Sequence, residues 1–313
     1  MLSTLERVIA KTRTKKAQRV KIFLLALPFL TLTFIFSYYP LYGWRYAFYD
    51  FRPPLRIQDI DFVGLTWFRA LWDNPARVSQ ITNVLRNTFG ISGLGILFSW
   101  LPIAFALLLQ EVKFTSAKKG IQILTTMPFY ISWVLIFSLA FAIFATDGMF
   151  NNLLISLGVI ERRIQFLQSD SYVWATMTAW SLWRGLGWGA IIYIAAIAGI
   201  DQELYEAARV DGANRFRLIW HITMPGIIPT YVVLLLLAIA NFFNTGFEQF
   251  YVFSNPFNMH RIQVLDLYIF RIGIGQQAWS FATAVSILRS IIGIILLFSV
   301  NGISKLLRGE YII

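Results

Sequence analysis

Few residues of this chain belong to the types that catalyse reactions or hold metals. The 313 residues include no cysteine and only two histidines, His221 and His260, which are too far apart in the sequence to form a metal cage. The chain has no G-x-x-x-x-G-K-[ST] phosphate loop, no H-E-x-x-H motif and no G-x-S-x-G motif. We therefore predict no catalytic residues, no metal ligands and no ATPase centre in this chain.

One arginine interrupts a long uncharged stretch. Arg184 is the only charged residue between Asp170 and Asp201. A cation at such a place in a membrane is costly and usually functional. We expect Arg184 to face an acidic partner, a water-filled cavity or an anionic substrate. A salt bridge to Glu248, or to another acid near the cavity, is the structural alternative.

Other polar groups lie within apolar stretches further along the chain. Asn241 and Asn244 are three residues apart, which would place both on one face of a helix. Their amides can bind a polar ligand, or they can join two helices by hydrogen bonds. Arg289 could pair with Asp266 or Glu248, or it could face a pore.

The segment 201–225 reads DQELYEAARVDGANRFRLIWHITMP and differs from its apolar surroundings. It combines a helix with small residues, a break at Gly212 and a second amphipathic stretch that ends at Pro225. A connection between two membrane helices could be much shorter. Small residues at the bend would let another protein approach closely. The alternative is an amphipathic connector that lies on the lipid surface.

The composition indicates that membrane-spanning helices position the polar residues described above. Apolar residues make up 57% of the chain and charged residues only 14%, compared with roughly 45–50% and about 25% in soluble domains. A helix needs roughly 20 apolar residues to cross a bilayer. The chain is therefore predicted to be an all-α integral membrane protein with six spans, at 22–44, 87–110, 120–146, 171–200, 221–248 and 280–304.

Basic residues predict the orientation of these spans, because cytoplasmic flanks retain positive charge. Seven lysines and arginines precede the first span, and Lys113, Lys118 and Lys119 follow the second. We expect both termini inside and attribute the net charge of +11 to topology rather than to nucleic-acid binding. The expected parts are a basic cytoplasmic segment 1–21, a transmembrane domain 22–304 with an outer loop 45–86 and an inner loop 201–224, and a cytoplasmic tail 305–313.

The inner loop also carries a motif of fixed spacing. Glu206-Ala207-Ala208 is followed by three residues, Gly212, nine residues and then Ile222-Thr223-Met224-Pro225. This pattern resembles the E-A-A…G…I-x-L-P loop of the permease subunits of bacterial binding-protein-dependent ABC importers. The departure is Met224 in place of leucine, which conserves volume. The resemblance implies a type I importer permease of the maltose-importer-like fold, without catalytic activity.

In that family the loop is the coupling helix, which sits in a cleft of the ATPase subunit. The resemblance gives this role to Glu206, Ala207, Ala208, Asp211, Gly212 and Pro225. It also implies a bacterial inner-membrane location, a second homologous permease in a heterodimer, two ATPase subunits that bind ATP and Mg, and a soluble solute-binding protein. No cofactor is expected on this chain itself, and the implied mechanism is alternating access.

The resemblance covers most of the chain and is closest to the oligosaccharide and polysaccharide branch, as in Asp147-Gly148-x-x-Asn151, 38–50, 205–217 and 307–310. In maltose-type permeases, the stretch that matches Trp183 and Gly185 contacts the sugar. The resemblance implies a substrate path along Arg184, Gly185, Trp188, Asn241, Asn244 and Tyr130. Tyr130 and Phe129 follow Pro128 at an expected kink.

An arginine at the sugar site suggests a negatively charged cargo. Arginine binds a carboxylate through two parallel hydrogen bonds and so selects acidic over neutral sugars. We expect a uronate oligosaccharide, derived from alginate or pectin. Two rival functions are an ion-driven secondary transporter of sugars, which tends to show a repeat and a membrane-embedded acid, and a membrane enzyme acting on lipid or glycan. Neither set of features is visible in the sequence.

Overall fold

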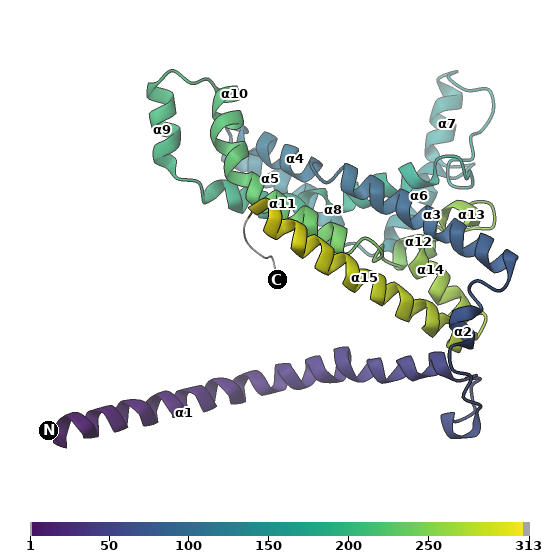
Figure 1. Ribbon diagram of the computed structural model, residues 1–313. Coiled ribbons are helices and arrows are strands. Elements are labelled where there is room, and N and C mark those ends of the chain that lie inside the picture. Colours follow the sequence, from purple (N-terminus) through teal and green to yellow (C-terminus); the bar gives the residue numbers. More distant parts are fainter. Residues whose placement is uncertain (1, 309–313) are drawn as a thin grey trace.

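The computed structural model describes residues 2–308, with side chains described for 18–56, 58–302 and 304–305 (Figure 1). Met1 and 309–313 lie outside the described residues, and with them the end of the expected tail 305–313 and of the stretch 307–310. Six helical segments are long and apolar enough to cross a membrane: Gln18–Phe48, Pro75–Gln110, Trp133–Ser156, Val173–Ala198, Arg215–Ala240 and Trp279–Gly302. The prediction of an all-helical protein with six spans is confirmed.

The first helix, α1 (Leu2–Thr33), stands apart from the others (Figure 1). A π-helical turn (Phe34–Tyr38) and a 3-10 helix (Tyr39–Phe48) continue it. Where its side chains are described, from Gln18 onward, most of its apolar side chains are exposed within this chain. Its far end is anchored, because Ala47 is buried against Ala284 and Ile287.

The segment 49–74 is folded and leads into the second span. It contains a 3-10 turn (Ile57–Asp59) and the short helix α2 (Thr66–Arg69). α3 (Pro75–Leu97) starts at Pro75, inside the stretch 45–86 that the sequence assigns to an outer loop. The Asn74 side chain accepts a hydrogen bond from the Ala76 amide at 2.8 Å and so caps this helix. A turn then separates α3 from α4 (Leu101–Gln110).

The third apolar stretch is broken near its middle. α5 (Thr115–Thr126) passes into a 3-10 turn (Met127–Tyr130), and α6 (Trp133–Phe144) starts after Ser132. Proline lacks the amide that a continuous helix needs, so the break at Pro128 follows from the sequence. This confirms the expected kink.

The region after α6 is organised by a buried amide. α7 (Met149–Ser156) carries Asn151, which is fully buried. The Asn151 side chain donates to the carbonyls of Ala145 (3.1 Å) and Ile164 (2.8 Å) and accepts from the Ile164 amide at 2.9 Å. Asn151 therefore holds both ends of the segment 145–164 together.

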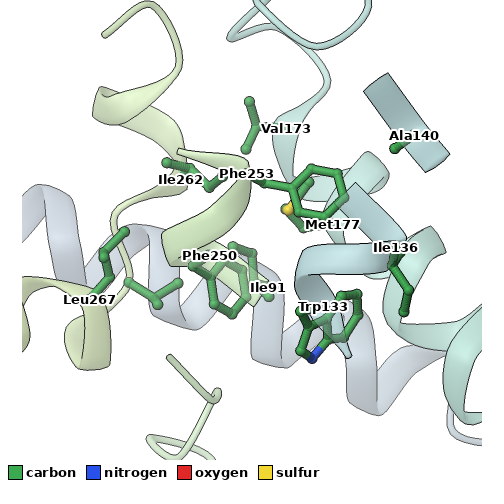
Figure 2. Close-up of a cluster of buried hydrophobic side chains, with 11 residues drawn as sticks. Ile91, Trp133, Ile136, Ala140, Val173, Met177, Phe250, Phe253, Ile262 and Leu267 are labelled. Atoms are coloured by element: carbon green, nitrogen blue, oxygen red, sulfur yellow. The ribbon is translucent and has the colours of Figure 1, made fainter. Parts of the chain in front are cut away.

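α8 (Val173–Ala198) runs through the centre and packs against α3, α4, α5 and α11. At its N-terminal half it joins the main apolar core, shown in Figure 2. Met177 of α8 lies there beside Phe250 and Phe253, with Trp133 and Ile136 of α6 close by. The core thus ties the third and fourth spans to the segment after the fifth.

The last part of the chain contains a second break. Two short elements, α9 (Gln202–Val210) and α10 (Arg215–Leu218), precede a π-helical turn (Ile219–Thr223) and α11 (Met224–Ala240). The helix ends at Ala240, although the apolar stretch was predicted to run to 248. Beyond it lie α12 (Glu248–Phe253), α13 (Met259–Ile262), α14 (Leu265–Phe270), a π-helical turn (Arg271–Gly275) and α15 (Trp279–Arg308).

This ending corrects one expectation. Asn241 is the residue that terminates α11, and Asn244 lies in the non-helical segment 241–247. The two asparagines therefore do not share a helix face. Polar residues and a glycine follow Ala240 and favour a turn over a continuing helix.

Candidate functional site

The loop 201–225 projects beyond the bundle, with α9 and α10 at one end of the molecule (Figure 1). Each of its short helices starts with a side-chain cap. Asp201 accepts from the Glu203 amide at 3.0 Å, and Asn214 accepts from the Arg217 amide at 2.9 Å. The sequence therefore specifies two helix starts within this loop.

Gly212 forms the bend between the two helices. Its φ of +78° lies in the left-handed region that residues with a side chain avoid. The Gly212 amide donates to Arg209 and the Ala213 amide to Ala208, at 3.1 and 2.9 Å. These bonds satisfy carbonyls at the end of α9, as is common at glycine-terminated helices. The left-handed backbone conformation at this position therefore explains why the residue is a glycine.

Two contacts tie the loop to the rest of the protein. The hydroxyls of Tyr205 and Thr223 are 3.0 Å apart, which joins the two arms of the loop. Arg215 forms an ion pair with Glu111 at 3.3 Å, just after α4. A force applied to the loop can thus reach α11 and α4.

The outer surface of the loop is unusual in its apolar content. Val210 is 88% exposed and Phe216 is 84% exposed, on either side of the bend. Of the residues predicted to couple to an ATPase, Glu206, Ala207, Asp211, Gly212 and Pro225 are exposed and Ala208 is half-buried. The sequence reasoning did not single out Val210 or Phe216, although both are apolar residues in a charged loop. Exposed apolar groups in a charged loop can contact either another protein or the lipid surface.

The predicted substrate-path residues gather around a cavity of about 560 Å³. Its wall comes from three parts of the chain, namely Phe129 and Trp133, then residues of α8, then the segment 244–249. The lining residues are Phe129, Trp133, Ser181, Arg184, Gly185, Asn244, Thr245, Gly246, Phe247, Glu248 and Gln249. Two smaller hollows, of about 350 and 340 Å³, adjoin it, since Asn244 lines all three and Asn241 lines both smaller ones. The three hollows meet at Asn244.

Arg184 enters this cavity without a carboxylate partner. Its Nε donates to the Ile131 carbonyl at 3.2 Å, and its guanidinium lies 4.8 Å from the ring centre of Trp133 and 5.4 Å from that of Phe129. No described carboxylate forms an ion pair with it. Glu248 lines the same cavity but does not pair with Arg184, so the structural alternative is not formed here. Aromatic faces stabilise the cation, and both terminal nitrogens stay available.

Trp188 and Tyr130 lie beside the cavity rather than among its lining residues. The Trp188 ring stacks on Phe129, with ring centres 4.6 Å apart and planes within 5°. Tyr130 meets Trp188 edge to face at 6.0 Å. One face of Trp188 is therefore already covered by Phe129, which itself lines the cavity.

Three polar residues of the wall were not predicted. The Ser181 hydroxyl donates to the Gln249 Oε1 at 2.7 Å, and the Gln249 amide donates to the Met177 carbonyl at 2.8 Å. Gln249 is buried, and Thr245 is half-buried. A polar side chain inside an apolar stretch was the only available signal for these residues, and it does not say which way they face.

Arg289 has the partner expected for it. Its Nη1 lies 2.6 Å from the Asp266 Oδ1, which confirms the first of the three alternatives. Arg289 also lines the hollow of about 340 Å³. No group of three His, Asp or Glu side chains within the described part of the chain could hold a metal ion.

Comparison with known proteins adds to this geometry. Residues 103–309 match the family described as "Binding-protein-dependent transport system inner membrane component". The chain is 40% identical to Protein LplB of Bacillus subtilis (strain 168), over 91% of this chain and 88% of that protein. It is 36% identical to the polygalacturonan/rhamnogalacturonan transport system permease protein YteP of the same organism, over 93% and 89%.

Two solved structures have a similar fold. One is the crystal structure of a bacterial alginate ABC transporter in complex with an alginate pentasaccharide-bound periplasmic protein. It matches with a TM-score of 0.82 and 29% identity, over 94% of this chain and 97% of that chain. A second structure, of a bacterial ABC transporter involved in the import of the acidic polysaccharide alginate, has the same TM-score and 28% identity.

Proposed function

We propose that this chain, which belongs to the family of binding-protein-dependent transport system inner membrane components, forms half of the translocation path of an ATP-driven importer of acidic oligosaccharides. It is a permease of the sugar and oligosaccharide ABC importers and a multi-pass protein of the bacterial inner membrane. A permease subunit of this family is not catalytic. The cargo, the partners and the residue roles below are our proposal.

The loop 201–225 is proposed to be the coupling helix that contacts a cytoplasmic ATPase subunit. In support, Val210 and Phe216 expose apolar surface on both sides of the Gly212 bend, and Glu206 and Asp211 add charge. A lipid-surface connector would place its apolar groups toward the bilayer, whereas this loop projects beyond the bundle (Figure 1). ATP and Mg would bind to two such partner subunits, and this chain would bind no cofactor.

The proposed orientation places both termini in the cytoplasm. The start of α1, the end of α15 and the α9–α10 loop lie toward the same end of the molecule, and α7 lies at the other (Figure 1). The division that we propose is a cytoplasmic segment 1–21, a transmembrane domain 22–304 and a cytoplasmic tail 305–313. The end that carries α7 would then receive cargo from a solute-binding protein.

Cargo would pass along the three hollows that meet at Asn244. Tyr130, Trp188, Asn241 and Asn244 are exposed in this chain. Polar side chains within a membrane are costly unless they face protein or a water-filled cavity, and a second, homologous permease would face them here. The apolar part of α1, from residue 22 onward, would be covered by lipid or by that same partner. We propose a heterodimer, as is usual for sugar importers of this family.

The proposal of an acidic cargo rests on the Arg184 guanidinium, which faces the cavity and forms no ion pair with a described carboxylate. Two parallel hydrogen bonds from its terminal nitrogens would bind a uronate carboxylate. The relative named for polygalacturonan/rhamnogalacturonan transport and the alginate transporter structures point to the same class of cargo. In an alternating-access cycle, closure of the ATPase pair would move the helices around this site.

The test uses the complete complex, with both permeases and the ATPase subunits, in proteoliposomes. Its solute-binding protein is loaded with a uronate oligosaccharide or with a neutral oligosaccharide of the same length. We expect the acidic cargo to stimulate ATP hydrolysis and uptake, and the neutral cargo to do so far less. Equal stimulation by both would contradict acidic selectivity, and stimulation by neither would contradict the transport function that we propose.

A further inference from the structure

The fifth span is interrupted where it reaches the hollows. The chain leaves the helix at Ala240 and stays non-helical until Glu248. Away from water, the amides and carbonyls of such a segment must find partners inside the protein. The Ser92 hydroxyl already donates to the Phe242 carbonyl at 2.7 Å. The Asn244 backbone amide donates locally, to the Asn241 carbonyl at 2.8 Å, whereas other partners of this segment come from elements far along the chain.

Arg289 of α15 and Asp266 of α14 supply most of these partners. Arg289 Nε donates to the Phe243 carbonyl at 3.2 Å. Asp266 Oδ2 accepts from the Gly246 amide at 3.1 Å and from the Thr245 hydroxyl at 3.3 Å. The two charges also pair with each other at 2.6 Å, and the Asp266 side chain is only 10% exposed. One ion pair therefore holds both sides of the interrupted segment.

The same pair determines how Asn244 is oriented. Arg289 Nη2 lies 3.1 Å from the Asn244 Oδ1. A guanidinium group has five donors and no acceptor, so only the amide oxygen of Asn244 can face it. The amide nitrogen must then lie on the other side of the group. No described side chain or backbone atom accepts a hydrogen bond from that nitrogen, and Asn244 lines all three hollows.

We infer that the Arg289–Asp266 ion pair is a positioning pair that makes Asn244 a hydrogen-bond donor toward cargo. The inference rests on the proposed function, because it concerns the same path. The Thr245 hydroxyl donates its proton to Asp266, so toward cargo it can only accept. The Asn244 amide and the Arg184 guanidinium are the donors proposed for this cavity. Together they would bind cargo atoms that accept hydrogen bonds, such as a carboxylate oxygen or a sugar oxygen.

The first experiment changes the donor and keeps the shape. Asn244→Asp has nearly the same size and can still accept from Arg289, but it has no donor for cargo. Uptake of the oligosaccharide that the wild-type complex imports is measured in proteoliposomes at varied concentrations of loaded binding protein. We expect the KM for uptake to rise about tenfold or more, with the maximal rate nearly unchanged. Asn244→Leu, which loses the donor without adding charge, is expected to raise KM in the same way.

A matched control makes the same chemical change elsewhere. Gln18→Glu makes the same amide-to-carboxylate change in the proposed cytoplasmic segment 1–21, where the Gln18 side chain is exposed and lies in neither the hollows nor α7. It is expected to leave KM within about twofold of the wild-type value. A wild-type KM in both Asn244 variants would overturn the inference, while wild-type uptake itself would still stand for the proposed function.

The second experiment asks whether the ion pair acts through Asn244. Asp266→Asn removes the negative charge that pairs with Arg289, and it is expected to raise KM. Arg289→Lys, made separately, is also expected to raise KM, since lysine can pair with Asp266 but has no planar guanidinium group to donate to Asn244 at the same time. In the Asn244→Leu background, Asp266→Asn is expected to add no further rise in KM. Asp266→Glu, which restores the charge, is expected to recover part of the affinity.

A purely structural role would give a different pattern. The single and double variants would then lower the amount of assembled complex, and their effects on KM would be absent or would multiply. Either pattern would overturn the inference. Arg289→Lys keeps a half-buried positive charge beside Asp266, so it provides the same test if Asp266→Asn fails to assemble.

Discussion

The loop 201–225 and the cavity around Arg184 are built in contrasting ways. The loop is one contiguous stretch whose two helices are capped by its own residues, and its predicted contact residues are almost all exposed. The cavity takes its wall from three separate parts of the chain, and its polar groups are bound to one another or to the backbone. A change in the loop can therefore alter a contact with another protein without much loss of stability. A change in the cavity would affect the proposed cargo binding and the packing together.

The largest effect is expected from breaking the loop at its bend. Proline requires a φ of about −65°, whereas Gly212 has +78°. Gly212→Pro is expected to reduce uptake by about a hundredfold or more, while basal ATP hydrolysis by the assembled complex continues. Glu206→Lys, which reverses an exposed charge, is also expected to reduce uptake while ATP hydrolysis continues. The measurement is ATPase rate against uptake in the same proteoliposomes.

Gly158→Pro is the matched control for this prediction. Gly158 also has a positive φ, of +69°, and like Gly212 it has open space where a side chain would lie. It lies in the segment after α7, at the other end of the molecule. We expect Gly158→Pro to lower the thermal stability about as much as Gly212→Pro does, and to leave ATP hydrolysis coupled to uptake. Preserved uptake in both Gly212→Pro and Glu206→Lys would contradict the coupling role of the loop.

The next largest effect is expected inside the cavity. Arg184→Leu removes the cation that faces the proposed carboxylate, and a hydrogen bond to a charged group contributes about 1.5–3 kcal/mol. The KM for an acidic oligosaccharide is expected to rise about ten- to a hundredfold, with basal ATPase activity unchanged. Arg184→Lys keeps the charge but loses the two parallel hydrogen bonds that a guanidinium group can form, so a KM between those of the wild type and Arg184→Leu is expected. Wild-type uptake of acidic cargo by Arg184→Leu, at unchanged expression, would refute the acidic-cargo proposal.

A smaller effect is expected beside the cavity. Trp188→Ala removes the ring that stacks on Phe129, a contact of about 0.5–1.5 kcal/mol for an aromatic pair. Because Phe129 lines the cavity, its position is expected to loosen and KM to rise about two- to tenfold. Trp188→Phe keeps a stacking ring and is expected to restore most of the affinity. A loss of coupling with unchanged KM would instead connect Trp188 with the loop.

The smallest effect is expected where the loop motif departs from its family pattern. Met224 is half-buried and packs against the core cluster of Ile103, Tyr193 and Ile227. Met224→Leu conserves volume and is expected to change stability by less than about 1.5 kcal/mol and uptake by less than about twofold. Thermal unfolding and uptake together check this. A large loss of uptake would mean that methionine itself has a role in this loop.

Much of the fold was predictable, because long apolar stretches have few alternatives in a membrane. Six spans followed from the distribution of charges, and the kink followed from Pro128. The end of the fifth helix was missed because the stretch was bounded by its charged residues, and none follows Ala240 before Glu248. The asparagines and the glycine in between were the available signal for a turn. The assumption that Asn241 and Asn244 share a helix face failed for this reason.

The spaced motif of the loop 201–225 and the membrane spans were determined by the sequence alone, since both depend on residues close together in the chain. Capping, a left-handed glycine and hydropathy are local properties. The tertiary structure decided that Arg184 faces a cavity, that Arg289 pairs with Asp266 and that Asn244 turns its oxygen toward that pair. These outcomes depend on which distant side chains meet, and a hydrogen bond or ion pair forms only where its partners are brought within about 3 Å.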